Sequence, residues 1–279
     1  MINQIGKYKL RVPLHKTEYS DIFVCRDTVL DVDVCVKLYN PKCDELNKPI
    51  ESDAELRERF LREAKVMARM DHPNLIAIRE YATRDDGTPY IVMPFLPATL
   101  KYEIGHDAVD PARRRKLPPK RRPHAIALPR ALQIWRQVLA GLSALHGFDL
   151  VHRDVKPGNI FLTAKSNGNA KLGDFGMVKI PGLEDVAPGR WVGTPNYMAP
   201  EQGVDSASVD TRADVFSAGV LAFRMIVGRL PQQGEGVADG ANAKIPKDIC
   251  SLIDACRNPD TTGRPKDASA VLDQLNAHA

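Results

Sequence analysis

A carboxylate on the apolar side of a helix sets a strict condition on the fold of this chain. Residues 52–67 have the spacing of a helix that begins with a capping box, because Glu55 follows Ser52 by three residues. Glu63 lies seven residues after Leu56, on nearly the same face as the apolar stripe of Leu56, Phe60, Ala64 and Met67. A buried carboxylate is unfavourable unless it is paired. The fold must therefore bring a cation against this helix.

Lys37 is the expected partner of Glu63. Residues 31–39 alternate as a strand does, and Lys37 shares one face of that strand with Cys35. The opposite face carries the apolar residues Val32, Val34, Val36 and Leu38. We therefore expect a strand that carries Lys37 to pack near a helix that carries Glu63.

The length of the chain suits one bilobal domain, because 279 residues lie near the upper limit for a single core. We interpret residues 1–279 as one such domain. The first third reads as strands with one helix, and its lobe covers about residues 1–93. "YIVMPFLP" (90–97) ends in prolines, which predicts a hinge at 94–97. The lobe formed by 98–279 is expected to be mainly helical, with helices at 129–146, 211–228, 246–257 and 266–277 and a loop at 234–243.

The basic character of the chain belongs to one segment. Residues 113–122, "RRRKLPPKRR", hold seven basic and no acidic residues, and removing these charges from the net +4 leaves −3. They lie within a proline-rich stretch, 101–127, that shows no periodicity and that we interpret as an inserted, mobile loop. It would serve as a docking patch for an acidic partner, as a nucleic-acid contact, or as a solvated loop. The last is the usual state of a charge run, and nucleic acid is the least expected.

The remaining composition indicates a cytoplasmic protein. No run of about 18 uncharged apolar residues exists, and the longest candidate, 215–223, is stopped by Arg224 and reads as a buried helix. The first ten residues lack the apolar centre of a secretory signal. Five cysteines without CxxC spacing favour reduced thiols over a zinc site or a disulfide framework.

Four motifs occur in a fixed order and carry the chemistry. Lys37 on its strand is followed by "HRDVKPGN" (152–159), "DFG" (174–176) and "GTPNYMAPE" (193–201). Through these motifs the chain resembles the eukaryotic-type serine/threonine protein kinases. The resemblance covers essentially the whole chain. The resemblance implies an α+β, bilobal protein-kinase fold, with an antiparallel sheet and one regulatory helix in the N-terminal lobe. It also implies ATP and Mg²⁺ (or Mn²⁺) as cofactors and proteins with Ser or Thr acceptors as substrates.

The resemblance assigns a role to each polar residue of the motifs. Asp154 would orient the attacking hydroxyl and Lys156 would steady the transferring phosphate. Asn159 and Asp174 would hold the metal, because hard oxygen ligands suit Mg²⁺. Lys37 would hold the α/β-phosphates, and Glu63 would aim it. Lysine at 156 together with "GTPNY" resembles serine/threonine rather than tyrosine kinases.

The same resemblance assigns roles to further residues. Thr194 would contact Asp154 and Lys156, Asp214 would anchor the catalytic loop (152–159), and Arg264 would pair with Glu201. The adenine would lie among Leu14, Ile22, Cys35 and Phe161, with Met93 as gatekeeper and Pro94 and Leu96 as hinge contacts. A stack of Met67, Ile78, His152 and Phe175 would link the Glu63 helix to the catalytic loop.

The chain departs from the family where glycines should cover the phosphates. In "LHKTEYSDIFVCRD" (14–27) the glycine positions hold His15, Thr17 and Ser20, and Glu18 adds a negative charge at the expected tip. Side chains there should stiffen the flap or hold it away from phosphate, although the hydroxyls of Thr17 and Ser20 would partly compensate by donating hydrogen bonds. We expect weakened rather than abolished ATP binding. The alternative is that this segment aligns differently.

The activation segment departs as well. Arg153 normally pairs with a phosphorylated residue, yet 176–192 contains no Ser, Thr or Tyr. We expect Glu184 or Asp185 to pair with Arg153 and to replace the phosphate, and the competing interpretation is a segment ordered by a partner.

For the whole chain, an active kinase is the first interpretation. A kinase-fold scaffold that acts through its basic insert is the second, and a nucleic-acid-associated adaptor is the third.

Overall fold

The computed structural model describes residues 3–17, 19–41, 52–107, 110–183, 193–241 and 245–277. The chain divides into two compact units. The first comprises Met1–His72 and Ile76–Leu96, and the second comprises Pro73–Leu75 and Pro97–Ala279. The main boundary falls between Leu96 and Pro97, within the segment expected to be the hinge.

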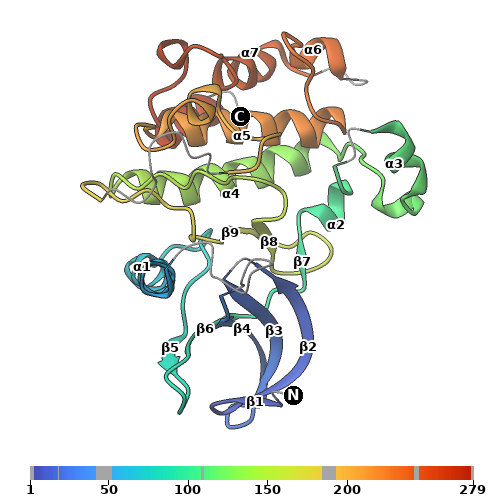
Figure 1. Ribbon diagram of the computed structural model, residues 1–279. Helices are drawn as coiled ribbons and strands as arrows, with labels where there is room; N and C mark the ends of the chain where they lie inside the picture. The colour runs from blue at the N-terminus through green and yellow to red at the C-terminus, as the bar shows by residue number, and fades with distance from the viewer. Residues whose placement is uncertain are drawn as a thin grey trace. The chain divides into compact units, whose positions relative to one another are not determined.

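The first unit is a six-stranded antiparallel sheet with one helix (Figure 1). Its strand order is β1-β2-β3-β4-β6-β5. One face of the sheet packs into a core that includes Val34, Val36 and Leu38, as their alternation predicted, whereas Val32 at the strand's start is exposed. The elements are β1 (Gln4–Ile5), β2 (Tyr8–Lys16), β3 (Ser20–Asp27), β4 (Val32–Tyr39), α1 (Asp53–Arg69), β5 (Glu80–Thr83) and β6 (Pro89–Pro94).

Helix α1 begins where its capping box predicts. The Ser52 hydroxyl accepts a hydrogen bond from the Glu55 amide, and the Glu55 carboxylate accepts one from the Ser52 amide. Tyr39, at the end of β4, holds the helix to the sheet: its hydroxyl donates to the Asp53 carboxylate (2.8 Å), and its ring meets that of Phe60 edge-on, with centroids 5.6 Å apart.

The second unit is mainly helical and carries a small sheet, in the order β7-β8-β9. Helices α4 and α5 lie side by side (Figure 1), and α5 is buried along most of its length. The helices expected at 129–146, 211–228, 246–257 and 266–277 are present. The elements are β7 (Ala98–Thr99), α2 (Lys101–Ile104), α3 (Pro111–Lys116), α4 (Leu128–His146), β8 (Ile160–Leu162), β9 (Ala170–Leu172), α5 (Arg212–Val227), α6 (Val237–Gly240), α7 (Lys247–Cys256) and α8 (Ala268–Ala277), with 3-10 turns at Pro119–Arg121, Pro200–Gly203 and Thr261–Gly263.

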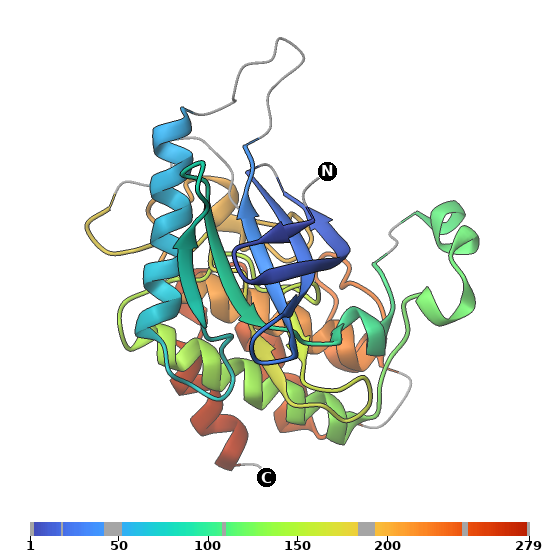
Figure 2. The same cartoon turned by 90° about the horizontal axis from the view of Figure 1, so that it is seen from below.

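The basic insert is not the structureless loop that we expected from 101–127. It contains α2, α3 and a 3-10 turn, which are too short to show periodicity in the sequence. Asp110 caps α3, since its carboxylate accepts from the Ala112 amide (2.8 Å), and Pro111 starts the helix. Figures 1 and 2 show α3 set apart from α4 and α5.

Backbone contacts close the insert at its base. His106 N donates to Arg121 O (2.9 Å) and His124 N donates to Ile104 O (3.1 Å). Gly105 lies between them with φ +76°, and a Cβ there would meet the Arg122 carbonyl oxygen at 2.1 Å. We call this base, residues 104–106 with 121–124, the neck of the insert.

The expected loop at 234–243 also contains a helical turn, α6. The Asp239 carboxylate accepts from the Gly236 amide (3.1 Å) and caps that turn. This capping pattern lies in a glycine-rich segment, which is why the sequence indicated a loop. None of the described helices combines the length and the apolar character that a bilayer-crossing segment needs.

Candidate functional site

The centre of the catalytic loop is a hydrogen-bonded cluster around Asp154. Lys156 Nζ lies 2.6 Å from Asp154 Oδ2, and Asn159 Nδ2 donates to the same oxygen (2.9 Å). Thr194 Oγ1 donates to Asp154 Oδ1 (2.8 Å) and accepts from Lys156 Nζ (2.8 Å). The predicted contacts of Thr194 are therefore present. The cluster presents a largely buried carboxylate, a cation and a hydroxyl within one hydrogen-bonding network.

Asp214, on α5, holds the backbone of this loop as predicted. It is fully buried and accepts from the amides of His152 (2.7 Å) and Arg153 (2.8 Å) and from His146 Nε2 (3.0 Å). Burial alone would raise the pKa of Asp214, but the hydrogen bonds from His146 and from the His152 amide outweigh it and leave the pKa lowered. Asp214 is therefore an ionised anchor for the catalytic loop.

Arg153 is held in a left-handed backbone conformation, with φ +64°. Such a conformation is rare for a residue with a side chain and clusters at functional sites. Its buried guanidinium donates to the carbonyls of Met177 (Nε, 2.7 Å) and Ser206 (3.2 Å). Its predicted partners, Glu184 and Asp185, lie outside the described residues, as does Glu18, so that pairing stays a prediction.

The "DFG" segment is fastened to the catalytic loop on both sides of Asp174. Gly173 N donates to Asn159 O (3.0 Å), and His152 Nε2 donates to Gly173 O (3.2 Å). The Phe175 ring meets the His152 imidazole edge-on, with centroids 5.7 Å apart. Asp174 itself has φ +65° and is exposed.

Asn159 and Asp174 fit a cation that is held partly by substrate oxygens. Both hydrogens of the Asn159 amide face Asp154, and its amide oxygen accepts no hydrogen bond within the described ranges. Asp174 adds an exposed carboxylate. Both are hard oxygen donors of the kind that Mg²⁺ prefers. No group of three or more His, Cys, Asp or Glu among the described residues is arranged as a self-contained metal site.

The first unit contains the predicted ion pair. Lys37 Nζ lies 2.8 and 2.7 Å from the two carboxylate oxygens of Glu63, and both side chains are nearly fully buried. This pairing accounts for a carboxylate on the apolar face of α1.

The strand register places several expected adenine contacts on one face of the first unit's sheet. Ile22 lies opposite Lys37, and Cys35 lies opposite Met93. Because paired residues point to the same side of a sheet, these side chains share the face of Lys37. Leu14, on β2, is half exposed. Pro94 and Leu96 also belong to the first unit, as do Met67 and Ile78, whereas Phe161, His152 and Phe175 belong to the second.

The glycine-free segment is a tight hairpin closed by hydroxyl groups. Thr17 N donates to Ser20 O (2.8 Å), Ser20 N donates to Thr17 Oγ1 (3.0 Å), and the two hydroxyl oxygens are 2.7 Å apart. Ser20 is fully buried. The hydroxyls that we expected to compensate for the missing glycines are therefore used first to close the turn.

Tyr19 is a residue that the sequence reasoning missed. The centroid of its buried ring lies 5.3 Å from the Lys37 ammonium and 5.4 Å from the Arg59 guanidinium. Its carbonyl accepts from Asn40 N (2.8 Å). The hairpin is thus bound to the residues around the Lys37–Glu63 pair.

A second predicted ion pair lies in the second unit. Arg264 donates to both carboxylate oxygens of Glu201, at 2.6 and 2.9 Å. Its guanidinium is fully buried and lies 4.9 Å from the Phe216 ring centroid. This bidentate geometry fixes the end of the "GTPNYMAPE" segment.

Comparison with known proteins gives a consistent result. Residues 14–276 match the protein kinase domain family. The chain is similar to serine/threonine-protein kinase PksC of Streptomyces coelicolor (31% identity over 96% of this chain and 48% of that protein). It is also similar to serine/threonine-protein kinase pkn2 of Myxococcus xanthus (28%, 98% and 32%) and to PknL of Mycobacterium tuberculosis (29%, 88% and 55%). The chain thus spans about a third to a half of these relatives' length.

Proposed function

We propose that this chain, which belongs to the protein kinase domain family and to its eukaryotic-type serine/threonine class, transfers the γ-phosphoryl group of ATP to serine or threonine hydroxyls of proteins. The observation that carries this proposal is the cluster in which Asp154, Lys156 and Thr194 contact one another. Phosphoryl transfer needs positioning and charge stabilisation more than covalent help, and the cluster offers both.

Each residue of the cluster has a role in that step. The Asp154 carboxylate accepts the proton of the attacking hydroxyl while that oxygen forms the new P–O bond and the bond from the γ-phosphorus to the ADP oxygen breaks. Lys156 offsets the charge on the transferring group. Thr194 holds the Asp154 carboxylate in one orientation, and Asp214 fixes the backbone on which it stands.

The nucleotide contacts that we propose are those that the family resemblance assigns. Asn159 and Asp174 would hold Mg²⁺ or Mn²⁺, and the bound ion supplies neutralisation of phosphate charge. Lys37, kept in place by Glu63, would donate to the α/β-phosphates. Leu14, Ile22, Cys35, Met93 and Phe161 would contact the adenine, with hinge contacts from Pro94 and Leu96.

Activity without a priming phosphate is part of this proposal. No Ser, Thr or Tyr occurs between Phe175 and Gly193, and Glu184 or Asp185 would supply the negative charge that pairs with Arg153. Charge reversal at both positions, Glu184→Lys with Asp185→Lys, is expected to lower activity at least tenfold. Undiminished activity would rule out their role.

Label transfer tests the main proposal. The chain is incubated with γ-labelled ATP, Mg²⁺ and a generic basic protein, and Asp154→Asn is the control. Transfer by the wild type and not by the variant is expected, with the label on serine or threonine. No transfer by the wild type would contradict the proposal.

A catalytically weak scaffold is the second candidate, and the turn closed by Thr17 and Ser20 is the observation that favours it. Such a turn lacks the open backbone that glycines would offer to phosphates. A thermal shift with Mg·ATP, measured beside the transfer assay, separates the two: stabilisation without transfer supports the scaffold. For either candidate, the cysteines favour a reducing, cytoplasmic location.

A further inference from the structure

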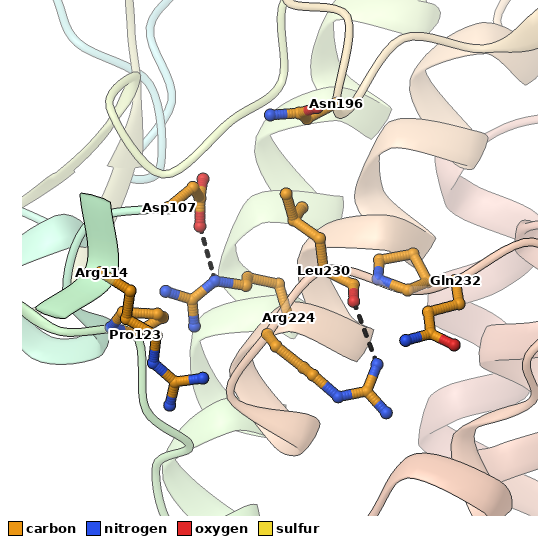
Figure 3. Close-up of a pocket in the computed structure, with 9 residues that line it drawn as sticks. Asp107, Arg114, Pro123, Asn196, Arg224, Leu230 and Gln232 are labelled. Atoms are coloured by element: carbon orange, nitrogen blue, oxygen red, sulfur yellow. Dashed lines mark hydrogen bonds and ion pairs between the residues drawn. The ribbon is translucent and has the colours of Figure 1, made fainter. Parts of the chain in front are cut away.

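A polar pocket of about 390 Å³ lies between the basic insert and the end of α5 (Figure 3). The insert contributes Arg114 of α3, and Asn196 comes from the "GTPNYMAPE" segment. The remaining lining residues are Asp107, Pro123, Arg224, Arg229, Leu230, Pro231 and Gln232. Three arginines and one aspartate thus face one pocket, and its lining includes none of the proposed catalytic or nucleotide-binding residues.

The single carboxylate of this pocket is already bonded on both oxygens. Asp107 Oδ1 accepts from Arg224 Nε (2.6 Å), and Asp107 Oδ2 accepts from the Tyr197 hydroxyl (2.8 Å). Arg224 is fully buried and also donates to carbonyls of the neck, at Ile104 (2.9 Å) and His124 (3.3 Å). Both carboxylate oxygens of Asp107 are therefore already hydrogen-bonded. This carboxylate does not compete with an anionic ligand for the other donors of the pocket.

Donors remain on the walls of the pocket. Arg229 is paired with Glu235 (2.7 Å to Oε2). Arg114, by contrast, is exposed, and its guanidinium makes no hydrogen bond or ion pair with the described part of the chain. The side-chain amides of Asn196 and Gln232 are exposed as well. The walls thus offer one uncompensated guanidinium and two amides, a set that suits an anion.

The pocket lies close to the cluster formed by Asp154, Lys156 and Thr194. Asn196 follows Thr194 by two residues, so their Cα atoms are at most about 7 Å apart, and Thr194 contacts both Asp154 and Lys156. The neighbouring Tyr197 is fastened to Asp107 at the pocket floor. An extended peptide advances about 3.3 Å per residue, so a side chain two to four residues from the phosphorylated one would reach this pocket.

We propose that the pocket formed by Arg114, Asn196, Arg224, Arg229 and Gln232 is a specificity site for an anionic side chain of the protein substrate, either a carboxylate or a phosphoryl group, two to four residues from the acceptor. The inference rests on the proposed kinase function. It gives one face of the basic insert a defined ligand, in place of a general affinity for acidic partners.

A peptide scan with two matched variants tests this site. Peptides with one serine acceptor in a neutral background carry aspartate or phosphoserine at each position from four before to four after the acceptor. The proteins are the wild type, Arg114→Glu and Arg115→Glu. Arg115 lies on the same helix, is exposed and does not line the pocket, so its variant makes the same change in net charge and controls for long-range electrostatics.

The wild type is expected to prefer an anion at one position, with kcat/KM about tenfold above that of the alanine peptide. Arg114→Glu is expected to reduce this ratio to about two or less, and Arg115→Glu to keep it. A higher ratio with phosphoserine identifies a phosphoryl ligand, and an equal or higher ratio with aspartate identifies a carboxylate; both support the site. No anionic preference, or an equal loss in both variants, would overturn it.

Binding separates failure of this site from failure of the proposed function. If no peptide is phosphorylated, fluorescence anisotropy of labelled aspartate and phosphoserine peptides is measured with the same three proteins. Weaker binding by Arg114→Glu alone would support the site in a protein that is not an active kinase. Equal binding by all three proteins, or displacement of the peptide by a single-stranded oligonucleotide at equal concentration, would overturn the site.

Discussion

Replacement of Asp214 by asparagine removes charge from the anchor of the catalytic loop and preserves its shape. The carboxylate accepts three hydrogen bonds: Oδ2 from His152 N and His146 Nε2, and Oδ1 from Arg153 N. An asparagine amide has one oxygen. If this oxygen serves the two donors at the Oδ2 position, the amide nitrogen faces Arg153 N, and two donors oppose each other in a fully buried place.

The expected loss of stability follows from these bonds. A buried donor left without an acceptor costs about 1–3 kcal/mol, and the two remaining bonds are weakened because they lose the charge of the acceptor. We expect the free energy of unfolding to fall by about 3 kcal/mol, which corresponds to a decrease of roughly 6–12 °C in Tm for a domain of this size. Displacement of the loop should also lower kcat by about 100-fold.

The effect should depend on pH with a defined sign. Because the pKa of Asp214 is lowered in the folded protein, the stabilisation is fully present above the ordinary carboxyl pKa of about 4 and is lost as pH falls through the folded value. The difference between wild type and Asp214→Asn should therefore be full at pH 7 and shrink below about pH 4.

Thermal and urea unfolding at several pH values measure these differences. Asp210→Asn is the matched control, because Asp210 is exposed and bonds mainly to its neighbour Arg212. We expect the control to lose less than about 1 kcal/mol. If Asp214→Asn loses no more than Asp210→Asn, the reasoning that buried charge-assisted hydrogen bonds hold the catalytic loop is refuted.

Three further expectations follow from the same structure. Lys37→Met removes the ammonium that neutralises Glu63 and should lower the free energy of unfolding, measured in urea, by about 3 kcal/mol. The double variant Lys37→Met/Glu63→Leu should recover part of this loss, and no recovery would contradict the pairing argument. Gly105→Ala should open the neck and speed proteolysis at 106–121, whereas Gly87→Ala, with a similar φ but open space at its Cβ, should not; equal cleavage of both variants would count against the neck. Burial raises the pKa of Cys25 and Cys256 to about 12, so both should stay unmodified by iodoacetamide at pH 8, as followed by peptide mass spectrometry, and modification of native Cys256 would disagree with this burial.

The sequence predicted best those features that depend on local pattern or on a forced pairing. The capping box gave the start of α1, and the alternation of residues 31–39 gave β4. Glu63 on an apolar face required a cation, which the structure supplies as Lys37. The contacts of Asp214 and Arg264 followed from the family resemblance, because single-residue spacing does not reveal partners 61 or 63 residues away.

Features built from distant residues were not predictable in this way. Arg224 read as the polar end of a buried helix, yet it is itself buried, and its carboxylate partner Asp107 lies 117 residues earlier. Tyr19 gave no signal, since its contacts with Lys37 and Arg59 depend on how a hairpin folds against α1. Helix α3 is too short for a periodic pattern, and its capping residue Asp110 is informative only once the helix is known.

The role of Arg224 depends on the shape of its guanidinium as well as on its charge. It reaches one carboxylate and three backbone carbonyls, those of Ile104, Gly105 and His124, in different directions from a single planar group. A lysine would carry the same charge but only one nitrogen, which cannot span acceptors spread along two chain segments. An exchange of Arg224 for lysine during evolution would therefore release the insert from α5, although the net charge of the protein would not change.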